Sequence, residues 1–396
     1  MTSGVKYVPI GDVTVGVENW NPQQFGAQSF EYIDLSSVDQ SEKKIVEARK
    51  IVGSEAPSRA RQIVEIGDVL VSTVRPNLNG VARVTEEFSG ATASTGFSVL
   101  RPTGKLDSGY LYHWVRSQSF VGEMVRKSTG ANYPAVTDRT VRAAMIPLVD
   151  IDRQRWIADV LDRVDTLRAR RRRVIAGVDA LVDSVFMQAF GDLCANDRGW
   201  STCRVGDFVA GFEAGKNVVG DDNSSDLRVL KVSSVTSGIF DPAEVKPVPA
   251  GYSPPVSHFV RSGDLLFSRA NTEELVGAVA LVHGCPPNLL LPDKIWRFEW
   301  RTEADALPWF AYRLFWQPSF RRVIRGRSTG TSGSMKNISQ DKVLSVVVGY
   351  PPLNERLKFS RQAEHLHRIG SVQRRALGEL DALFASLQHR AFRGEL

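Results

Sequence analysis

Apolar residues recur every three to four positions over two long stretches of the chain, 151–192 and 351–396. From Ile151 to Phe190 there is no proline, and only Gly177 interrupts residues that favour helix. The pattern therefore predicts one helix of about 40 residues, roughly 60 Å long at the rise of an α-helix. The apolar positions keep heptad spacing at Ile157, Leu161, Val164, Ile175, Val178, Val182, Val185 and Ala189. Arg168 and Arg171 interrupt this apolar stripe at its centre.

The same heptad returns 202 residues later, with Gly370 and Gln373 at its centre. Its apolar positions are Phe359, Ala363, Leu366, Leu377, Leu380, Phe384, Leu387 and Ala391. A stripe of about five heptads is typical of a coiled coil. We expect the two helices to pair with each other, antiparallel if the intervening domain sits at the far end of the first helix. Packing of each helix only on its own domain is the alternative.

Shorter motifs repeat in the same order and nearly the same spacing. Gly67-Asp68 before an apolar run recurs as Gly263-Asp264, and Ser128-Thr129-Gly130 recurs as Ser328-Thr329-Gly330. Earlier in each half, Ile10-Gly11-Asp12 recurs as Val205-Gly206-Asp207. Four collinear blocks, counting the helix ends, indicate an internal duplication. The predicted order is a globular domain over 1–150, a long helix over 151–192, a second domain over 193–350 and a second long helix over 351–396.

Charge follows the duplication. The 396 residues carry a net charge of +6, yet residues 1–100 and 201–300 each hold 9 basic and 12 acidic residues. The segments directly before the long helices are basic: residues 101–150 hold 7 basic and 4 acidic residues, and residues 301–350 hold 8 basic and 3 acidic residues. A mildly basic chain is compatible with a nucleic-acid partner.

In both copies, basic residues lie beside a loop of small residues, Ser128–Tyr133 in the first and Ser328–Ser334 in the second. Such loops let a phosphate backbone approach closely, while arginine supplies a forked charge. The candidate DNA-binding residues are Arg126, Lys127, Asn132, Tyr133, Arg139, Arg142, Arg321, Arg322, Arg325, Arg327, Lys336 and Asn337. For each basic residue, a solvated helix end that complements the helix dipole is an equally good interpretation.

Signatures of catalysis, metal binding and export are lacking. The chain has no phosphate-binding or dinucleotide-binding glycine motif, and its three cysteines are too scattered for a zinc site or a disulfide framework. Asp293 and Glu299 could ligate Mg²⁺, but the matching first-copy segment 96–100 has no acids. No signal peptide and no run of about 18 apolar residues is present, so we expect a cytoplasmic protein without a membrane segment.

The tandem layout resembles the specificity subunits of Type I restriction-modification systems. The resemblance rests on Ile146-Pro147-Leu148 and Pro351-Pro352-Leu353, each of which opens a long helix. The family pattern is close to Pro-Pro-Leu-x-Glu-Gln, and this chain departs from it at Arg153 and Arg356. The resemblance implies two mixed α/β target recognition domains, in agreement with strand-like runs at Val69–Val74 and Leu265–Ser268. It also implies an antiparallel coiled coil with pseudo-twofold internal symmetry.

The resemblance further implies a non-catalytic subunit in which each domain binds one half of a bipartite double-stranded DNA site. The helices would set the spacing and dock two methyltransferase subunits, which bind S-adenosylmethionine, so this chain would need no cofactor of its own. A restriction subunit with motor and nuclease activities would complete the complex. Two other functions remain open: a stand-alone DNA-modifying enzyme and a scaffold that binds two protein partners.

Overall fold

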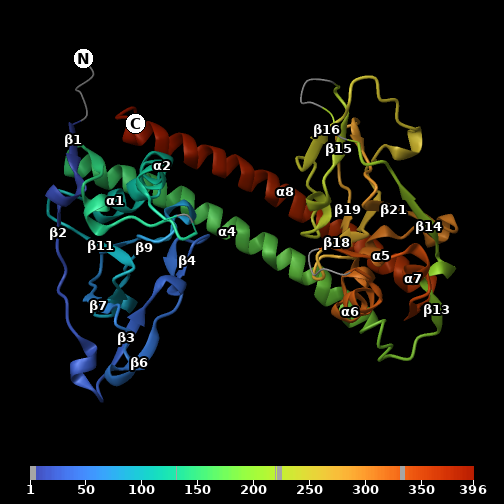
Figure 1. Ribbon diagram of the computed structural model, residues 1–396, viewed down its shortest axis with the longest axis horizontal. Coiled ribbons are helices and arrows are strands. Elements are labelled where there is room, and N and C mark those ends of the chain that lie inside the picture. The colour runs from blue at the N-terminus through green and yellow to red at the C-terminus, as the bar shows by residue number, and fades with distance from the viewer. Residues whose placement is uncertain (1–5, 131, 219, 221–224, 331–334) are drawn as a thin grey trace. The chain divides into compact units, whose positions relative to one another are not determined.

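The computed structural model describes residues 6–130, 132–218, 220, 225–330 and 335–396. The chain divides into two compact units, each described by itself below. Unit 1 comprises Met1–Arg173 and Gln373–Leu396, and unit 2 comprises Val174–Val372. The two long helices, α4 (Ile151–Phe190) and α8 (Leu353–Phe392), contribute to both units (Figure 1). The predicted mixed α/β class with two long helices is confirmed.

Unit 1 is built on an antiparallel sheet of four strands in the order β2-β11-β8-β9. These strands are β2 (Thr14–Val15), β11 (Phe97–Pro102), β8 (Val69–Ser72) and β9 (Val81–Arg83). Successive side chains of a strand point to opposite faces, and β8 is apolar on both. Val69 and Val71 pack toward the helices, whereas Leu70 packs toward a second sheet. The sheet is therefore the central layer of the unit.

The second sheet of unit 1 has the order β6-β3-β10-β7, in which only β3 and β10 are parallel. Its strands are β6 (Arg49–Val52), β3 (Ser29–Ile33), β10 (Thr92–Ser94) and β7 (Ala60–Ile63). Two short antiparallel pairs complete the strands: β1 (Lys6–Pro9) with β12 (Met145–Leu148), and β4 (Val38–Asp39) with β5 (Lys44–Ile45).

Three helices of unit 1 precede α4, and each begins at a side-chain cap. They are α1 (Ser108–Val115), α2 (Gln118–Lys127) and α3 (Asp138–Arg142). Asp107, Ser117 and Thr137 accept hydrogen bonds from backbone N–H groups in the first turns, which would otherwise lack partners. These caps fix where each of the three helices begins.

Unit 2 repeats this plan. Its main sheet has the order β14-β21-β17-β19, with β14 (Val209–Ala214), β21 (Ile295–Trp300), β17 (Leu265–Ser268) and β19 (Val279–Leu281). The second sheet has three strands in the order β16-β15-β20: β16 (Val245–Pro247), β15 (Arg228–Leu230) and β20 (Leu289–Leu290). Two pairs follow, β13 (Thr202–Arg204) with β23 (Val347–Gly349) and β18 (Ala270–Asn271) with β22 (Lys336–Asn337). The helices are α5 (Pro308–Trp316), α6 (Pro318–Arg327) and α7 (Gln340–Leu344).

The repeated Gly-Asp motif has the same structural cause in both units. Gly67 and Gly263 have φ angles of 87° and 93°, a left-handed conformation that glycine adopts without steric cost. The aspartate that follows closes the turn: Asp68 accepts a hydrogen bond from the Glu65 N–H, and Asp264 accepts one from the Arg261 N–H, both at 2.8 Å. The motif is conserved between the two copies because it makes the turn into the central strand.

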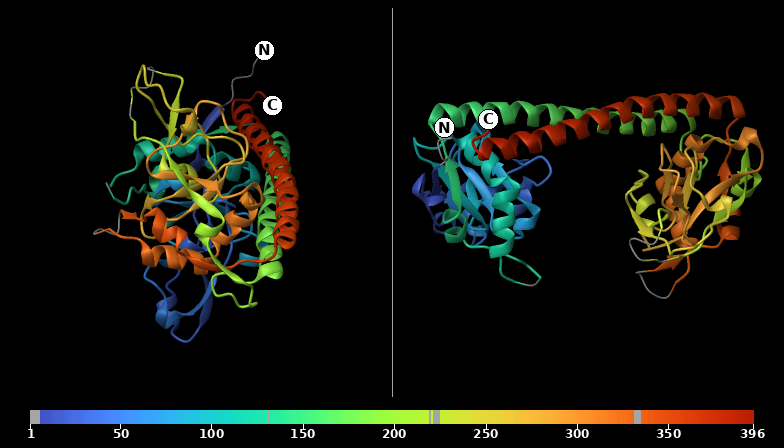
Figure 2. Two further views of the ribbon diagram at one scale, coloured as in Figure 1. Left: turned by 90° about the vertical axis from the view of Figure 1, so that its right-hand side faces the viewer. Right: turned by 90° about the horizontal axis from the view of Figure 1, so that it is seen from above.

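In unit 1 the first half of α4 and the last half of α8 run side by side in opposite directions (Figure 2). Ile157, Leu161 and Val164 are buried in one cluster with Phe384 and Ala391 of α8 and with residues of α1. Leu380 and Leu387 are half-buried against the same cluster. The two central arginines bond across the pair, Arg168 to Asp381 at 2.6 Å and Arg171 to Gln373.

In unit 2 the last half of α4 packs against the first half of α8. Phe359 is buried against Phe186 and Phe190, with ring centroids 5.1 and 5.7 Å apart. Val185 and Leu366 are half-buried against this cluster, and Val178 is half-buried as well. The predicted antiparallel pairing of the helices is therefore present within each unit.

Candidate nucleic-acid interface

The loop between α2 and α3, described at residues 128–130 and 132–137, projects from unit 1 on the side away from the helices (Figure 2, right). Its base is closed by two backbone hydrogen bonds between Thr129 and Ala135, of 3.0 and 2.9 Å. Gly130 has a φ of 102°, where a Cβ atom would lie 2.8 Å from the Tyr133 carbonyl oxygen. The loop therefore turns tightly and leaves Asn132 and Tyr133 exposed at its end.

Four basic residues predicted near this loop differ in their contacts. Arg126 and Arg139 are exposed, and neither side chain has a hydrogen bond or ion pair among the described residues. Lys127 forms an ion pair of 2.6 Å with Glu123. Arg142 points inward, where it bonds to Asp138, to the Thr14 hydroxyl and, at 2.7 Å, to the Val99 carbonyl. Arg126 and Arg139 are the two whose charges remain available to a phosphate.

The corresponding segment of unit 2 follows α6, and its described residues are 328–330 and 335–337. Thr329 and Asn337 close its base with hydrogen bonds of 2.7 and 2.8 Å. Lys336 is half-buried, and its ammonium group donates to the Gly330 carbonyl. Ser334, the predicted end of this loop, lies outside the described residues.

Most of the arginines of α6 form hydrogen bonds within unit 2. Arg321 is 5% exposed, and its guanidinium donates to the carbonyls of Val276 and Glu274 at 2.8 and 2.7 Å. Burial lowers its pKa to about 10, which leaves it charged at neutral pH. Arg325 also donates to the Glu274 carbonyl, at 3.1 Å.

Arg327 and Arg322 complete this set. Arg327 donates to the Lys342 carbonyl and to the Ser345 hydroxyl, at 2.8 and 2.9 Å. Arg322 is exposed and has no such contact among the described residues. Arg321, Arg325 and Arg327 therefore hold loops in place, and Arg322 is the member of the set that is open to a ligand.

Sequence reasoning missed a second element at the same end of unit 1, the loop Arg75–Asn79. The Arg75 N–H donates to the Pro134 carbonyl at 2.7 Å, so this loop lies directly beside the α2–α3 loop. The Arg75 guanidinium stacks over the Tyr133 ring, 4.7 Å from its centroid. A signal was present in the sequence Arg-Pro-Asn-Leu-Asn, which combines turn-forming residues with base-reading side chains directly after a buried strand.

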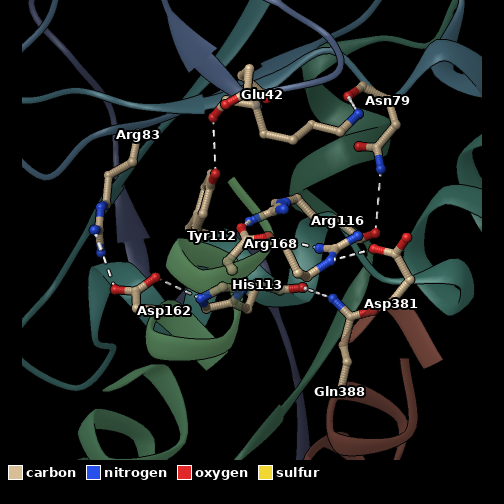
Figure 3. A network of polar contacts seen from close by, with 12 residues as sticks. Glu42, Asn79, Arg83, Tyr112, His113, Arg116, Asp162, Arg168, Asp381 and Gln388 are labelled. Atoms are coloured by element: carbon tan, nitrogen blue, oxygen red, sulfur yellow. Dashed lines mark hydrogen bonds and ion pairs between the residues drawn. The ribbon is translucent and has the colours of Figure 1, made fainter. Parts of the chain in front are cut away.

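A polar cluster fixes α1 of unit 1 to the helices, and we call it the helix-docking cluster (Figure 3). It consists of Tyr112 and His113 of α1, Arg116 directly after α1, Asp162, Asp165 and Arg168 of α4, and Asp381 of α8. His113 bonds to Asp162 at 2.8 Å, and Arg116 bonds to Asp165 at 2.7 Å. Beside the cluster lies a recess of about 410 Å³.

The helix-docking cluster also holds the Arg75–Asn79 loop. The Asn79 side chain donates to the Arg116 carbonyl, and the Lys43 ammonium donates to the Asn79 carbonyl at 2.6 Å. The Tyr112 hydroxyl in turn donates to the Lys43 carbonyl at 2.9 Å. Burial, together with the nearby Arg116 charge, lowers the pKa of Lys43 to about 8. The loop is therefore tied to the long helix through specific side chains.

Charges within the cluster are mutually stabilised. Burial lowers the pKa of His113 below its ordinary value, so the imidazole is neutral at pH 7. Burial acts to raise the pKa of Asp165, but the charges of Arg116 and Arg168 outweigh it and hold that pKa below the ordinary value. The cluster is therefore a set of complementary charges, which is the arrangement that makes burial of ions tolerable.

Metal-binding groups of three or more His, Cys, Asp or Glu residues are absent from the part of the chain that the structure describes. Over the same residues, no helix combines the length and the apolar character needed to cross a membrane.

Two mixed α/β units, each with exposed arginines and each sharing the pair of long helices, define a two-site binding scaffold. No protein-family model matches the chain. The chain is 28% identical over 319 residues to the specificity subunit of the Type I restriction enzyme EcoKI of Escherichia coli K12. This match covers 75% of the chain and 68% of that protein. The resemblance to specificity subunits of Type I restriction-modification systems is thereby confirmed.

Solved structures show the same fold over the whole chain. The S subunit of a Type I restriction-modification system from M. genitalium matches with a TM-score of 0.58 at 12% identity, covering 99% of this chain and 97% of that one. A structure from work on complex assembly and conformational transition of the type I R-M system matches with a TM-score of 0.56 at 23% identity, covering 100% and 99%.

Proposed function

We propose that this chain is the DNA-specificity subunit of a Type I restriction-modification complex, in which unit 1 and unit 2 each bind one half of a bipartite target. The observation that carries the proposal is the duplication itself. In each unit the loop after the second short helix is closed at its base by a β-bridge. Exposed arginines without a hydrogen bond or ion pair among the described residues lie beside it, Arg126 and Arg139 in unit 1 and Arg322 in unit 2. Phosphate contacts from such residues supply affinity, and base contacts from neighbouring loops supply specificity.

The long helices fit the role of a spacer. Each helix contributes residues to both units. An α-helix rises 1.5 Å per residue, and a change of one heptad changes its length by about 10 Å, roughly three base pairs of DNA. We therefore propose that helix length sets the gap between the half-sites.

The proposed partners follow from the family. Two methyltransferase subunits would dock on the helices and bring S-adenosylmethionine, and a motor-nuclease subunit would join them. In this proposal the chain itself contributes no catalytic residue and no cofactor site. Its part in the reaction is to hold the complex on one DNA sequence.

The test is co-purification of the full chain with the methyltransferase subunit, followed by methylation of a random-sequence DNA library. We expect methylation only when both proteins are present, and only at sites with two fixed half-sites and a fixed gap. Methylation or cleavage by the chain alone would instead identify a stand-alone enzyme. A complex that binds its protein partner but shows no DNA sequence preference would identify a protein scaffold.

A further inference from the structure

Loop Arg75–Asn79 of unit 1 is held rigidly in a strained conformation. Arg75 and Asn79 both have φ angles of 49°, in the left-handed region. That conformation is unfavourable for a non-glycine residue such as arginine, which keeps it only where surrounding contacts impose it. Such strain in a well-anchored loop is typical of a functional position.

The contacts that impose this conformation are specific. At its start, the Arg75 N–H bonds to Pro134 of the α2–α3 loop at 2.7 Å. At its end, Asn79 bonds to the Arg116 carbonyl and accepts from Lys43. The loop is thereby fixed at one end to the projecting loop and at the other to the helix-docking cluster. A loop fixed at both ends presents its side chains without paying for their ordering when DNA binds.

The exposed side chains of this loop are suited to base edges. The Arg75 guanidinium lies over the Tyr133 ring. A guanidinium that stacks on an aromatic ring can still donate hydrogen bonds in its own plane. No carboxylate pairs with Arg75 among the described residues. Asn77 is exposed between Pro76 and Leu78, and its side chain has no hydrogen bond within the described chain.

Arginine and asparagine are the side chains that form bidentate contacts with guanine and adenine in the major groove. Beside Arg75 and Tyr133 lies a recess of about 280 Å³ whose wall includes Leu35, Val38 and Phe97. This apolar wall can contact a thymine methyl group or the edge of a base.

We propose that Arg75 and Asn77 read base edges in the half-site bound by unit 1, with Tyr133 as the positioning residue that orients Arg75. The inference rests on the proposed DNA-specificity function and assigns base reading to particular side chains. Arg126 and Arg139 then contact phosphates, which fix the position of the unit without reading sequence.

The test compares the wild-type complex with Arg75→Lys, Arg75→Asn and Asn77→Ala variants on the random-sequence library. Lysine keeps the positive charge but lacks the fork, and asparagine tolerates the left-handed backbone. Asn77→Ala removes a side chain without internal hydrogen bonds, so it tests the loop even if the Arg75 variants fold poorly. Arg59→Lys is the matched control, because Arg59 is an exposed arginine of unit 1 outside both loops and the long helices.

We expect each loop variant to relax one or two base positions, lowering discrimination there by about tenfold to a hundredfold. The changed positions lie in one half-site, and the other half-site and the gap stay the same. Arg59→Lys leaves the whole motif unchanged. Tyr133→Ala is expected to relax the position that Arg75 reads and no other.

Two results would overturn the inference. An unchanged motif in all loop variants would show that the loop does not read bases. The second result is that Arg75→Asn weakens binding to all DNA sequences equally and makes binding less dependent on salt, while Arg75→Lys binds like the wild type. This result would show that Arg75 contacts a phosphate. In either case the wild-type complex still methylates a bipartite motif, whereas failure of the proposed function itself would leave the wild-type complex with no such motif.

Discussion

Unit 1 and unit 2 share the plan of the main four-stranded sheet followed by three short helices, yet they attach these helices to α4 and α8 by different chemistry. In unit 1, charged side chains of α1 and α4 meet in the helix-docking cluster, and Arg116 is only 7% exposed there. In unit 2 the contact is mainly aromatic: Phe186 and Phe190 each lie within 5.9 Å of both Phe310 and Phe359 by centroid distance. One ion pair, Arg313 with Asp183, lies beside these rings.

The difference has energetic consequences. Packing of aromatic rings stabilises the helix contact in proportion to the buried area, and it tolerates small rotations of one helix against another. Paired buried charges add little net stability, because the cost of desolvation offsets their attraction. They do require one particular arrangement of the two side chains. We infer that unit 2 relies on its helix contact mainly for stability, whereas unit 1 uses it to orient the Arg75–Asn79 loop, which bonds to the same cluster.

The loops that correspond to one another have also diverged. In unit 2 the segment that matches the Arg75–Asn79 loop contains exposed Glu273 and Glu274 instead of arginine. Its backbone is held by the buried Arg321, where unit 1 uses Asn79 and Lys43. Loops of opposite charge on one scaffold are consistent with two unlike half-sites, because acidic and basic side chains select different base edges.

The largest effect is expected in the aromatic contact of unit 2. Phe359→Ala removes a ring that is 1% exposed and packed on two other rings, which costs about 3–5 kcal/mol. Hydrogen exchange of the α5 and α8 segments of unit 2 measures the loss as a lower opening free energy. Val372→Ala, at a position that is 63% exposed, is the control and is expected to change little. Equal losses in the two variants would contradict the proposed role of aromatic burial.

The next effect is expected in the helix-docking cluster. Asp165→Ala leaves the Arg116 guanidinium buried without its carboxylate, at a cost of about 2–3 kcal/mol in unit 1. The double variant Asp165→Leu with Arg116→Met removes both charges and should lose less stability than the single variant, measured by hydrogen exchange of α1. However, the double variant should discriminate less well between bases at the positions that the Arg75–Asn79 loop reads. If the double variant methylates an unaltered motif, the helix-docking cluster does not contribute to base recognition.

Acidification should weaken unit 1 selectively. The pKa of His113 is lowered by burial, so the unfolded chain binds a proton more readily than the folded unit, and stability falls as pH drops below the ordinary histidine value of 6.5. The Asp165 contribution, whose pKa is held below its ordinary 3.8, is lost only at still lower pH. Hydrogen exchange of α1 between pH 7.5 and 5.5 measures this trend. His113→Phe should flatten it, and an unchanged slope would rule out His113 as its source.

The smallest effect is expected at the exposed edge of the same cluster. Asp381 pairs with Arg168 and Arg172 but is 44% exposed, so Asp381→Ala should cost less than about 1 kcal/mol and the loss should shrink further in high salt. Thermal unfolding in low and high salt checks both statements. A loss as large as that of Asp165→Ala would mean that exposure does not distinguish the two ion pairs.

Features with local or periodic causes were predictable from the sequence. The bounds of the first long helix, Ile151–Phe190, follow from heptad spacing and the absence of proline, and the structure has the helix over the same residues. The repeated Gly-Asp turns needed only the conformational freedom of Gly67 and Gly263. The family resemblance followed from the duplicated layout.

Features that depend on distant contacts were not predictable. Arg321 was expected on a basic surface, but it lies beneath a loop about 45 residues earlier in the chain, where only the folded structure places carbonyl partners around it. The bond between His113 and Asp162 joins residues 49 positions apart. The Arg75–Asn79 loop was missed because its relation to Tyr133 arises from the pairing of two segments more than 50 residues apart.

A methylation map of the full chain in complex with its methyltransferase subunit tests the central claim most directly, namely that two units on one helix pair read two half-sites. The account predicts a single bipartite motif with two unlike half-sites separated by a constant gap. One uninterrupted motif, or methylation without any fixed sequence, would contradict it.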